Sequence, residues 1–126
     1  MDDVLYREEI LEYAFSTIHR GRLESPDYQA DLNNAFCGDR IHLELGVDSR
    51  SIVERARFDG QGCAISQAAA AMLAEWVEGK PLAEARAFSA DDMLEHLGIR
   101  PNPARLKCAL LAWRALQRAI QADRPE

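Results

Sequence analysis

Cysteine is scarce in this sequence: only Cys37, Cys63 and Cys108 occur among 126 residues. No two of them form a Cys-x-x-Cys pair, and their spacing matches no short-range metal motif. Spacing alone therefore favours the simplest interpretation, three buried thiols that pack as small hydrophobic side chains. The odd number of cysteines and the acidic start at residues 1–3 argue against a secreted framework of disulfides. We expect a reducing, cytoplasmic compartment.

Long apolar runs and an excess of positive charge are also absent. The longest uninterrupted apolar run, from Ala68 to Ala74, is too short to span a bilayer, so we expect no membrane association. The formal net charge of -6 gives no basic surface for phosphate backbones, so we expect no nucleic-acid partner. With 48% hydrophobic residues, the chain suits a single domain over residues 1–126.

The apolar pattern of the first half predicts a helix followed by a small sheet. Helical spacing predicts an amphipathic helix from Val4 to Ile18, with Ile10, Leu11, Ala14, Phe15 and Ile18 on its apolar stripe. Strict alternation predicts a strand from Ile41 to Val47 with one buried face and with His42 pointing outward to the surface. Weaker patterns predict strands over residues 51–58, with Ile52, Ala56 and Phe58 on one side, and over residues 26–33.

The second half predicts helices. A stripe of apolar residues predicts a core helix over residues 65–77. Ser89, with Asp92 three residues later, resembles a capping box and predicts a short helix that ends at residue 97. The last helix is expected over residues 103–120, because an asparagine precedes a proline at its first position.

This order places the cysteines at three element ends. Cys37 enters a strand, Cys63 stands at a strand-to-helix turn, and Cys108 lies in the opening turns of a helix, so all three can meet at one end of the sheet. Asp39 adds a harder oxygen donor beside soft sulfur. A helix N-terminus favours the thiolate, the form that binds metals and attacks sulfur electrophiles.

Two basic residues stand near the third cysteine. Arg105 and Lys107 add positive charge that would partly neutralise a site of three thiolates and one carboxylate. For Lys107, an ordinary solvated position on the helix surface is an equally good interpretation.

Three blocks of sequence around the cysteines carry a family resemblance: residues 34–39 (NAFCGD), 57–66 (RFDGQGCAIS) and 104–113 (ARLKCALLAW). In order, and over nearly the whole chain, they resemble the signature blocks of the NifU N-terminal, IscU-like iron–sulfur assembly proteins. The resemblance implies an α+β fold in which a small three-stranded antiparallel sheet packs against four to five helices. It also implies a metal or cluster site made by Cys37, Asp39, Cys63 and Cys108.

Within this family the chain most resembles the SufU branch, zinc-containing proteins that take sulfur from a cysteine desulfurase. The scaffold branch has histidine directly before its third cysteine and a Leu-Pro-Pro-Val-Lys motif upstream, whereas this chain has Lys107 and lacks the motif. The insertion that the SufU branch carries between its second and third cysteines is absent here.

The resemblance implies an iron–sulfur assembly protein that relays sulfur with zinc as cofactor. Its expected partners are a SufS-type cysteine desulfurase and downstream iron–sulfur assembly proteins, and sulfurtransferase activity of its own stays open. Cys37, next to Gly38 and expected on a loop, is the expected sulfur acceptor. Two alternatives remain: a scaffold that binds iron, or builds a 2Fe–2S cluster and hands it on, and a small structural zinc domain.

Overall fold

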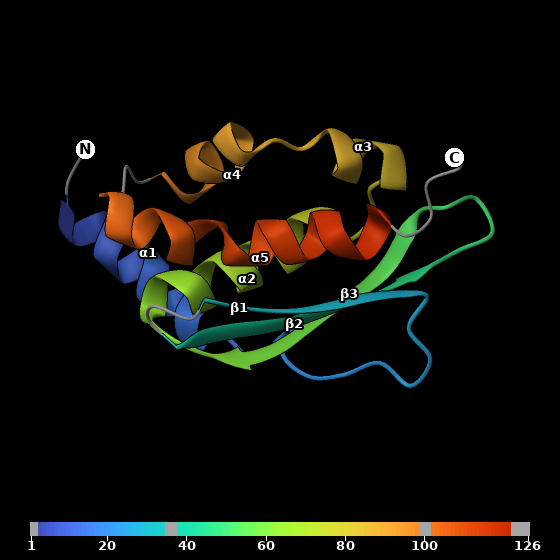
Figure 1. Ribbon diagram of the computed structural model, residues 1–126, viewed down its shortest axis with the longest axis horizontal. Helices are drawn as coiled ribbons and strands as arrows, with labels where there is room; N and C mark the ends of the chain where they lie inside the picture. The colour runs from blue at the N-terminus through green and yellow to red at the C-terminus, as the bar shows by residue number, and fades with distance from the viewer. Residues whose placement is uncertain (1–2, 35–37, 99–101, 122–126) are drawn as a thin grey trace.

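The computed structural model describes residues 3–34, 38–98 and 102–121. Within these ranges the elements are α1 Asp3–Phe15, β1 Tyr28–Asn34, β2 Asp39–Val47, β3 Val53–Gln61, α2 Ala64–Val77, α3 Leu82–Ala87, α4 Ala90–Leu97 and α5 Pro103–Gln121 (Figure 1). The predicted α+β class with a small three-stranded antiparallel sheet is confirmed. No helix in these ranges has both the length and the apolar character that crossing a membrane requires.

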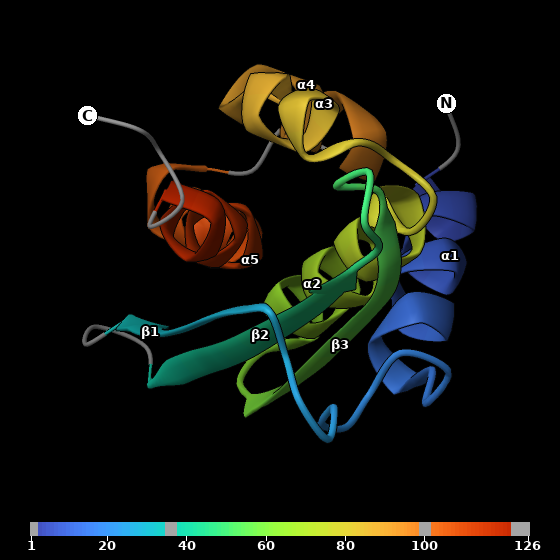
Figure 2. The same ribbon diagram turned by 90° about the vertical axis from the view of Figure 1, so that its right-hand side faces the viewer.

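The sheet has the order β1-β2-β3, with both neighbouring pairs antiparallel. Helices α2 and α5 pack on one face, where α5 contacts β1 and β2 while α2 contacts β3 (Figure 2). Helix α1 lies beside α2, and α3 and α4 form a further layer over the helices. Ile41, Leu43 and Leu45 of β2 are almost fully buried and form the centre of the core.

Helix α2 is the central helix of the fold. Ten of its 14 residues are buried, including the four consecutive alanines at 68–71. A helix that is apolar nearly all round must be covered on several sides, and α2 contacts α1, α5 and β3. Its first turn, directly after Cys63, is therefore fixed by the core.

Both faces of β2 are covered, which corrects the predicted outward position of His42. Residues 41–45 are all buried, and His42 is only 8% exposed, with its Nε2 2.8 Å from Glu44 Oε2. The segment that follows α1 covers this face, because the N–H of Leu23 donates to Glu44 Oε1 at 2.6 Å. The alternating pattern could not reveal this cover, since it comes from a distant part of the chain.

The first helix ends earlier than predicted, and only part of its predicted stripe is buried. Helix α1 ends at Phe15, which is 79% exposed, and Ile18 beyond it is 75% exposed. Ala14 of the predicted stripe is buried and Ile10 is half-buried. Tyr13, which was not on that stripe, is also half-buried, and its hydroxyl donates to Glu75 of α2 at 2.9 Å. The prediction was wrong for Leu11, Phe15 and Ile18, which are exposed because α1 packs mainly against α2.

The strand predicted over residues 51–58 runs instead from Val53 to Gln61. A register shift between Gly46 and Val47 places an extra residue in β3, and such a bulge reverses the side to which the following side chains point. Ala56 and Phe58 are fully buried as predicted, but before the bulge Val53 is fully buried while Ile52 is only half-buried.

The helices of the second half agree with the prediction, and their caps explain why. The Ser89 hydroxyl accepts the N–H of Asp92 at 3.0 Å in a capping box, and Gly98 ends α4 in the left-handed conformation. Asn102 Oδ1 accepts the N–H of Arg105 at 2.9 Å and caps α5. The short helix α3 was not among the predicted ranges, because six residues carry too little periodicity to indicate a helix.

Candidate metal centre

Asp39 is the first residue of β2, where its Cα pairs with that of Asn34 in β1. It is only 1% exposed, and burying a carboxylate is costly unless it is hydrogen-bonded. Its Oδ1 accepts the backbone N–H of Cys63 at 2.9 Å, and its Oδ2 lies 3.7 Å from the Cys63 thiol, which donates. Asp39 therefore joins the start of β2 to the start of α2.

Cys63 is the N-cap residue of α2, with the extended backbone typical of that position. Gly62 precedes it with φ +151°, a conformation that other residues rarely adopt. A Cβ atom on Gly62 would clash with Asp39 Oδ1 and would lie 2.7 Å from Ser66 Oγ. Glycine at position 62 thus allows the carboxylate to reach the Cys63 turn.

Cys108 reaches the same place from α5. It lies in the second turn of that helix and is 5% exposed. Helix α5 packs across β1 and β2 and against α2, so the position of the thiol is set by the core. The partial charge of a helix N-terminus acts mainly on the first turn, and Cys108 lies beyond that turn of α5.

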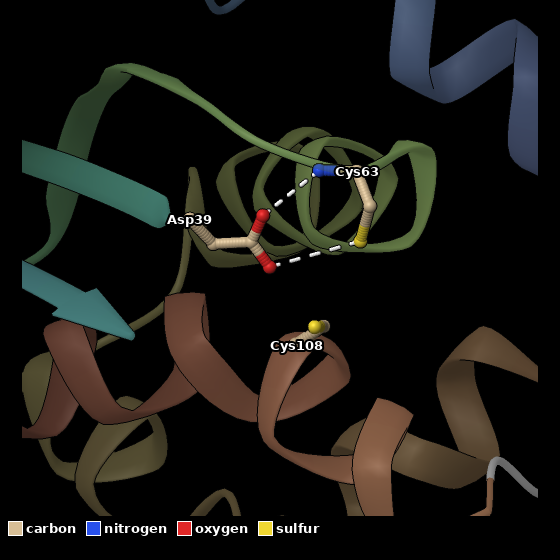
Figure 3. Close-up of side chains that lie close together, drawn as sticks. All are labelled: Asp39, Cys63 and Cys108. Carbon is tan, nitrogen blue, oxygen red and sulfur yellow. Dashed lines mark hydrogen bonds between the residues drawn. The ribbon is translucent and has the colours of Figure 1, made fainter. Parts of the chain in front are cut away.

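The three side chains converge from three separate elements (Figure 3). The ligand atoms of Asp39, Cys63 and Cys108 all lie within 4.8 Å of one another. Two ligands of a tetrahedral zinc ion are about 3.6 Å apart, given metal–ligand bonds of about 2.0–2.3 Å, and the carboxylate and thiol of the first two are 3.7 Å apart. Two sulfur donors and one oxygen donor at this spacing fit zinc or iron.

The remaining predicted site residues have different positions. Cys37, which stands two residues before Asp39 in the sequence, lies outside the described residues. Arg105 and Lys107 are exposed on the first turns of α5. The structure thus brings together three of the four predicted ligands, and their role in metal binding stays a prediction.

Sequence reasoning missed the polar residues behind Cys63. Ser66 is fully buried, and its hydroxyl donates to the Cys63 carbonyl oxygen at 3.0 Å. The side chain of Gln67 is also buried, and its Oε1 accepts a hydrogen bond from Arg20 at 3.0 Å. The available signal was a pair of polar residues in the first turn of a helix that is otherwise apolar.

Two carboxylates on β1 and β2 have lowered pKa values. Burial by itself would raise the pKa of Glu44, but hydrogen bonds from the Leu23 N–H and from His42 outweigh it, so the pKa is lowered. The pKa of Asp31 is lowered chiefly by its hydrogen bonds from Arg40, at 2.7 and 3.1 Å. Both carboxylates are therefore charged at neutral pH, where they fasten the strands and the covering segment.

Comparison with known proteins identifies relatives with the same architecture. Residues 5–124 match the family model of the NifU-like N terminal domain. The chain is 35% identical to the zinc-dependent sulfurtransferase SufU of Bacillus subtilis, over 96% of this chain and 92% of that protein. It is 34% identical to the iron–sulfur cluster assembly scaffold protein IscU of Thermotoga maritima, over 94% of both chains.

A solved structure supports the same relationship. The crystal structure described as a putative iron–sulfur cluster assembly scaffold protein for the SUF system, from Fervidobacterium islandicum, superposes with a TM-score of 0.81 and 26% identity. The match covers 95% of this chain and 99% of that one.

Both sequence relatives contain additional residues within the aligned region. The alignment with the Bacillus protein runs over 138 positions, although it contains only 96% of this chain, about 121 residues. The alignment with the Thermotoga protein likewise has 136 positions for 94% of the chain, about 118 residues. Both relatives thus have residues without a counterpart here.

On the family match and these identities, the chain belongs to the family of NifU-like N-terminal domains, the iron–sulfur cluster assembly proteins of the SufU and IscU kind.

Proposed function

We propose that this protein is a zinc-dependent sulfur acceptor in iron–sulfur cluster assembly, which receives sulfur from a SufS-type cysteine desulfurase. The observation that carries the proposal is the convergence of Asp39, Cys63 and Cys108. Cys37 stands only two residues before Asp39 in the sequence. The name of the Bacillus relative, a zinc-dependent sulfurtransferase, supports the same role.

Four residues would hold the zinc ion: Cys37, Asp39, Cys63 and Cys108. When bound, zinc would keep the cysteine side chains as thiolates at neutral pH. The carboxylate is the hardest donor of this set and the one that a softer ligand displaces most readily. Asp39 already has a second role for its oxygens, because they accept hydrogen bonds from Cys63. A ligand with such an alternative partner can leave the metal without becoming unsatisfied.

The proposed transfer is a thiol exchange on sulfur. The Cys37 thiolate attacks the terminal sulfur of the desulfurase persulfide, a new S–S bond forms at Cys37, and the desulfurase cysteine leaves as thiolate. No external oxidant or reductant takes part, because the persulfide sulfur keeps its oxidation state. The sulfur then passes to downstream iron–sulfur assembly proteins by the same kind of exchange.

The surroundings of the other cysteines favour Cys37 as the acceptor. Cys63 is held at its N–H and its thiol by Asp39 and at its carbonyl by Ser66. Cys108 is buried within a helix that packs on the sheet. Attack on a partner's persulfide requires access to that partner. The buried Cys108 lacks such access, and the partly exposed Cys63 is held in place by its hydrogen bonds.

The proposal is tested by mixing the zinc-loaded protein with a SufS-type desulfurase and cysteine. Mass spectrometry of the peptides should find the extra sulfur on Cys37, and Cys37→Ser should abolish both this label and the stimulation of desulfurase turnover. Cys37→Ala, which has neither the thiol nor the hydroxyl of the serine variant, serves as the matched variant. Persulfide found only on Cys108, or equal stimulation by wild type and Cys37→Ser, would contradict the assignment.

A scaffold role is the second candidate, and one observation favours it: the IscU scaffold of Thermotoga is almost as similar, at 34% identity, as the Bacillus sulfurtransferase. The same donors can hold an iron–sulfur cluster, because clusters also need thiolate ligands. The oxygen ligand would be exchanged more easily than sulfur, which would help to hand the cluster on. Metal analysis after purification without added metal separates the candidates. Colourless protein with one zinc supports the sulfur acceptor, and brown protein with iron and sulfide supports the scaffold. Zinc without any effect on a desulfurase indicates a structural zinc domain.

A further inference from the structure

We propose that Ser66 is a positioning residue that holds the turn of Cys63 so that its thiol faces Asp39 and Cys108. This inference rests on the proposed function, since it concerns the same centre. Ser66 is the third residue of α2 and is fully buried. A buried hydroxyl needs a hydrogen-bond partner, and here the partner is the carbonyl oxygen of Cys63 itself, at 3.0 Å.

Contacts fix Cys63 on both sides of its Cα atom. The N–H is held by Asp39 Oδ1 at 2.9 Å, and the carbonyl oxygen accepts both the Ser66 hydroxyl and the N–H of Gln67, the latter at 3.1 Å. The direction of a side chain follows the backbone angles of its residue. Ser66 therefore acts on the thiol through the peptide group between residues 63 and 64, which it keeps from tilting.

Ser66 also limits the space behind the turn. Ser66 Oγ would lie only 2.7 Å from a Cβ at position 62. Gln67 Nε2 lies 3.5 Å from the same Ser66 Oγ. The network continues outward, because Gln67 Oε1 accepts a hydrogen bond from Arg20, whose guanidinium lies 4.7 Å from the ring centre of Phe58. The turn of Cys63 is thus braced against the segment that follows α1.

An ordinary structural role is the competing explanation. Serine in a helix often donates to a carbonyl one turn back, with no consequence beyond the helix itself. Ser89 provides the matched control, because it also forms a hydrogen bond in the first turn of a helix, with the Asp92 N–H at 3.0 Å, but in α4. If Ser66 only stabilises its helix, Ser66→Ala and Ser89→Ala will differ in stability alone.

The experiment compares these two variants with wild type by two measurements. The first, on metal-free reduced protein, is the rate at which iodoacetamide alkylates Cys63, followed by peptide mass spectrometry with Cys108 as the internal reference. The second is titration with cobalt(II), read from its sulfur-to-metal absorption and from competition with a chelator. We expect Ser66→Ala to alkylate several-fold faster at Cys63, to shift the cobalt absorption, and to weaken cobalt binding about 10- to 100-fold, as is usual for residues behind metal ligands. Ser89→Ala should match wild type in both measurements.

Equal alkylation rates and cobalt spectra for Ser66→Ala and Ser89→Ala would overturn the proposal. If wild type binds no cobalt, the proposed metal function fails, while the alkylation rates still decide whether Ser66 positions Cys63. Should Ser66→Ala not fold, Gln67→Leu replaces it, with Gln117→Leu as its control because Gln117 also bridges elements, to Ala85 O at 2.9 Å. Gln67→Leu is expected to shift both measurements in the same direction by a smaller factor, and an unchanged pattern would again overturn the proposal.

Discussion

Replacing Gly62 by alanine tests the contact on which the centre depends. The new Cβ would clash with Asp39 Oδ1, so the carboxylate must move away and release the N–H of Cys63. The backbone at φ +151° adds strain, which costs about 1–3 kcal/mol for a residue other than glycine. A lost hydrogen bond to a charged group adds about 1.5–3 kcal/mol.

The expected loss of unfolding free energy for Gly62→Ala is therefore about 2.5–6 kcal/mol, a large part of the 5–15 kcal/mol typical of a domain. Urea unfolding of the metal-free protein at pH 7, followed by circular dichroism, measures it. Gly79→Ala is the matched control, because Gly79 has φ +89° but no atom within 4 Å of its would-be Cβ. That variant should lose only the strain.

A double-mutant cycle isolates the Asp39 contact. When Asp39→Ala is already present, Gly62→Ala should cost less than it does in wild type, because of the close contacts of the new Cβ only the one with Ser66 Oγ, at 2.7 Å, remains. The two changes at the centre should therefore be coupled by at least about 1 kcal/mol. Additive losses, or equal losses for Gly62→Ala and Gly79→Ala, would refute the argument that glycine is needed for the approach of the carboxylate.

Three further predictions concern the metal and the charges. Removing zinc from the zinc-loaded protein with a chelator should lower the melting temperature, because a ligand present at 1,000 times its dissociation constant stabilises the fold by about 4 kcal/mol. The same melting temperature for stripped and stoichiometrically loaded protein would show that the metal site is peripheral and does not stabilise the fold. Asp39→Ala should cost about 1.5–3 kcal/mol in urea unfolding, whereas Asp39→Asn, which keeps an acceptor for the Cys63 N–H, should cost less; equal costs would show that this hydrogen bond contributes little. Glu44 has a lowered folded pKa, so its contribution to stability is complete above the ordinary carboxyl pKa and is lost as the pH falls through the folded value. Glu44→Gln should therefore make the acid side of a stability-against-pH curve shallower, and an unchanged slope would contradict this role of the carboxylate.

Much of the local structure could be read from the sequence, because its signals act within a few residues. The capping pair Ser89 and Asp92 and the Asn102 cap define helix starts through side chains that bond the nearest free N–H groups. The same holds for the surroundings of Cys63: a glycine, a cysteine and an apolar helix in succession indicate a tight strand-to-helix turn. The three blocks around the cysteines also sufficed to indicate the family.

Tertiary structure decided what depends on distant parts of the chain. Whether His42 is exposed is set by the segment around Leu23, which crosses the sheet and fastens to Glu44. The hydrogen bond from the Cys63 N–H to the Asp39 carboxylate depends on the register of β2 and β3 and on the packing of α2 on the core. The alternation of apolar residues in the two strands reveals neither. Periodicity reports which side of an element is apolar, but the partner that covers it is chosen by long-range packing, and the chemistry of this centre depends on that choice.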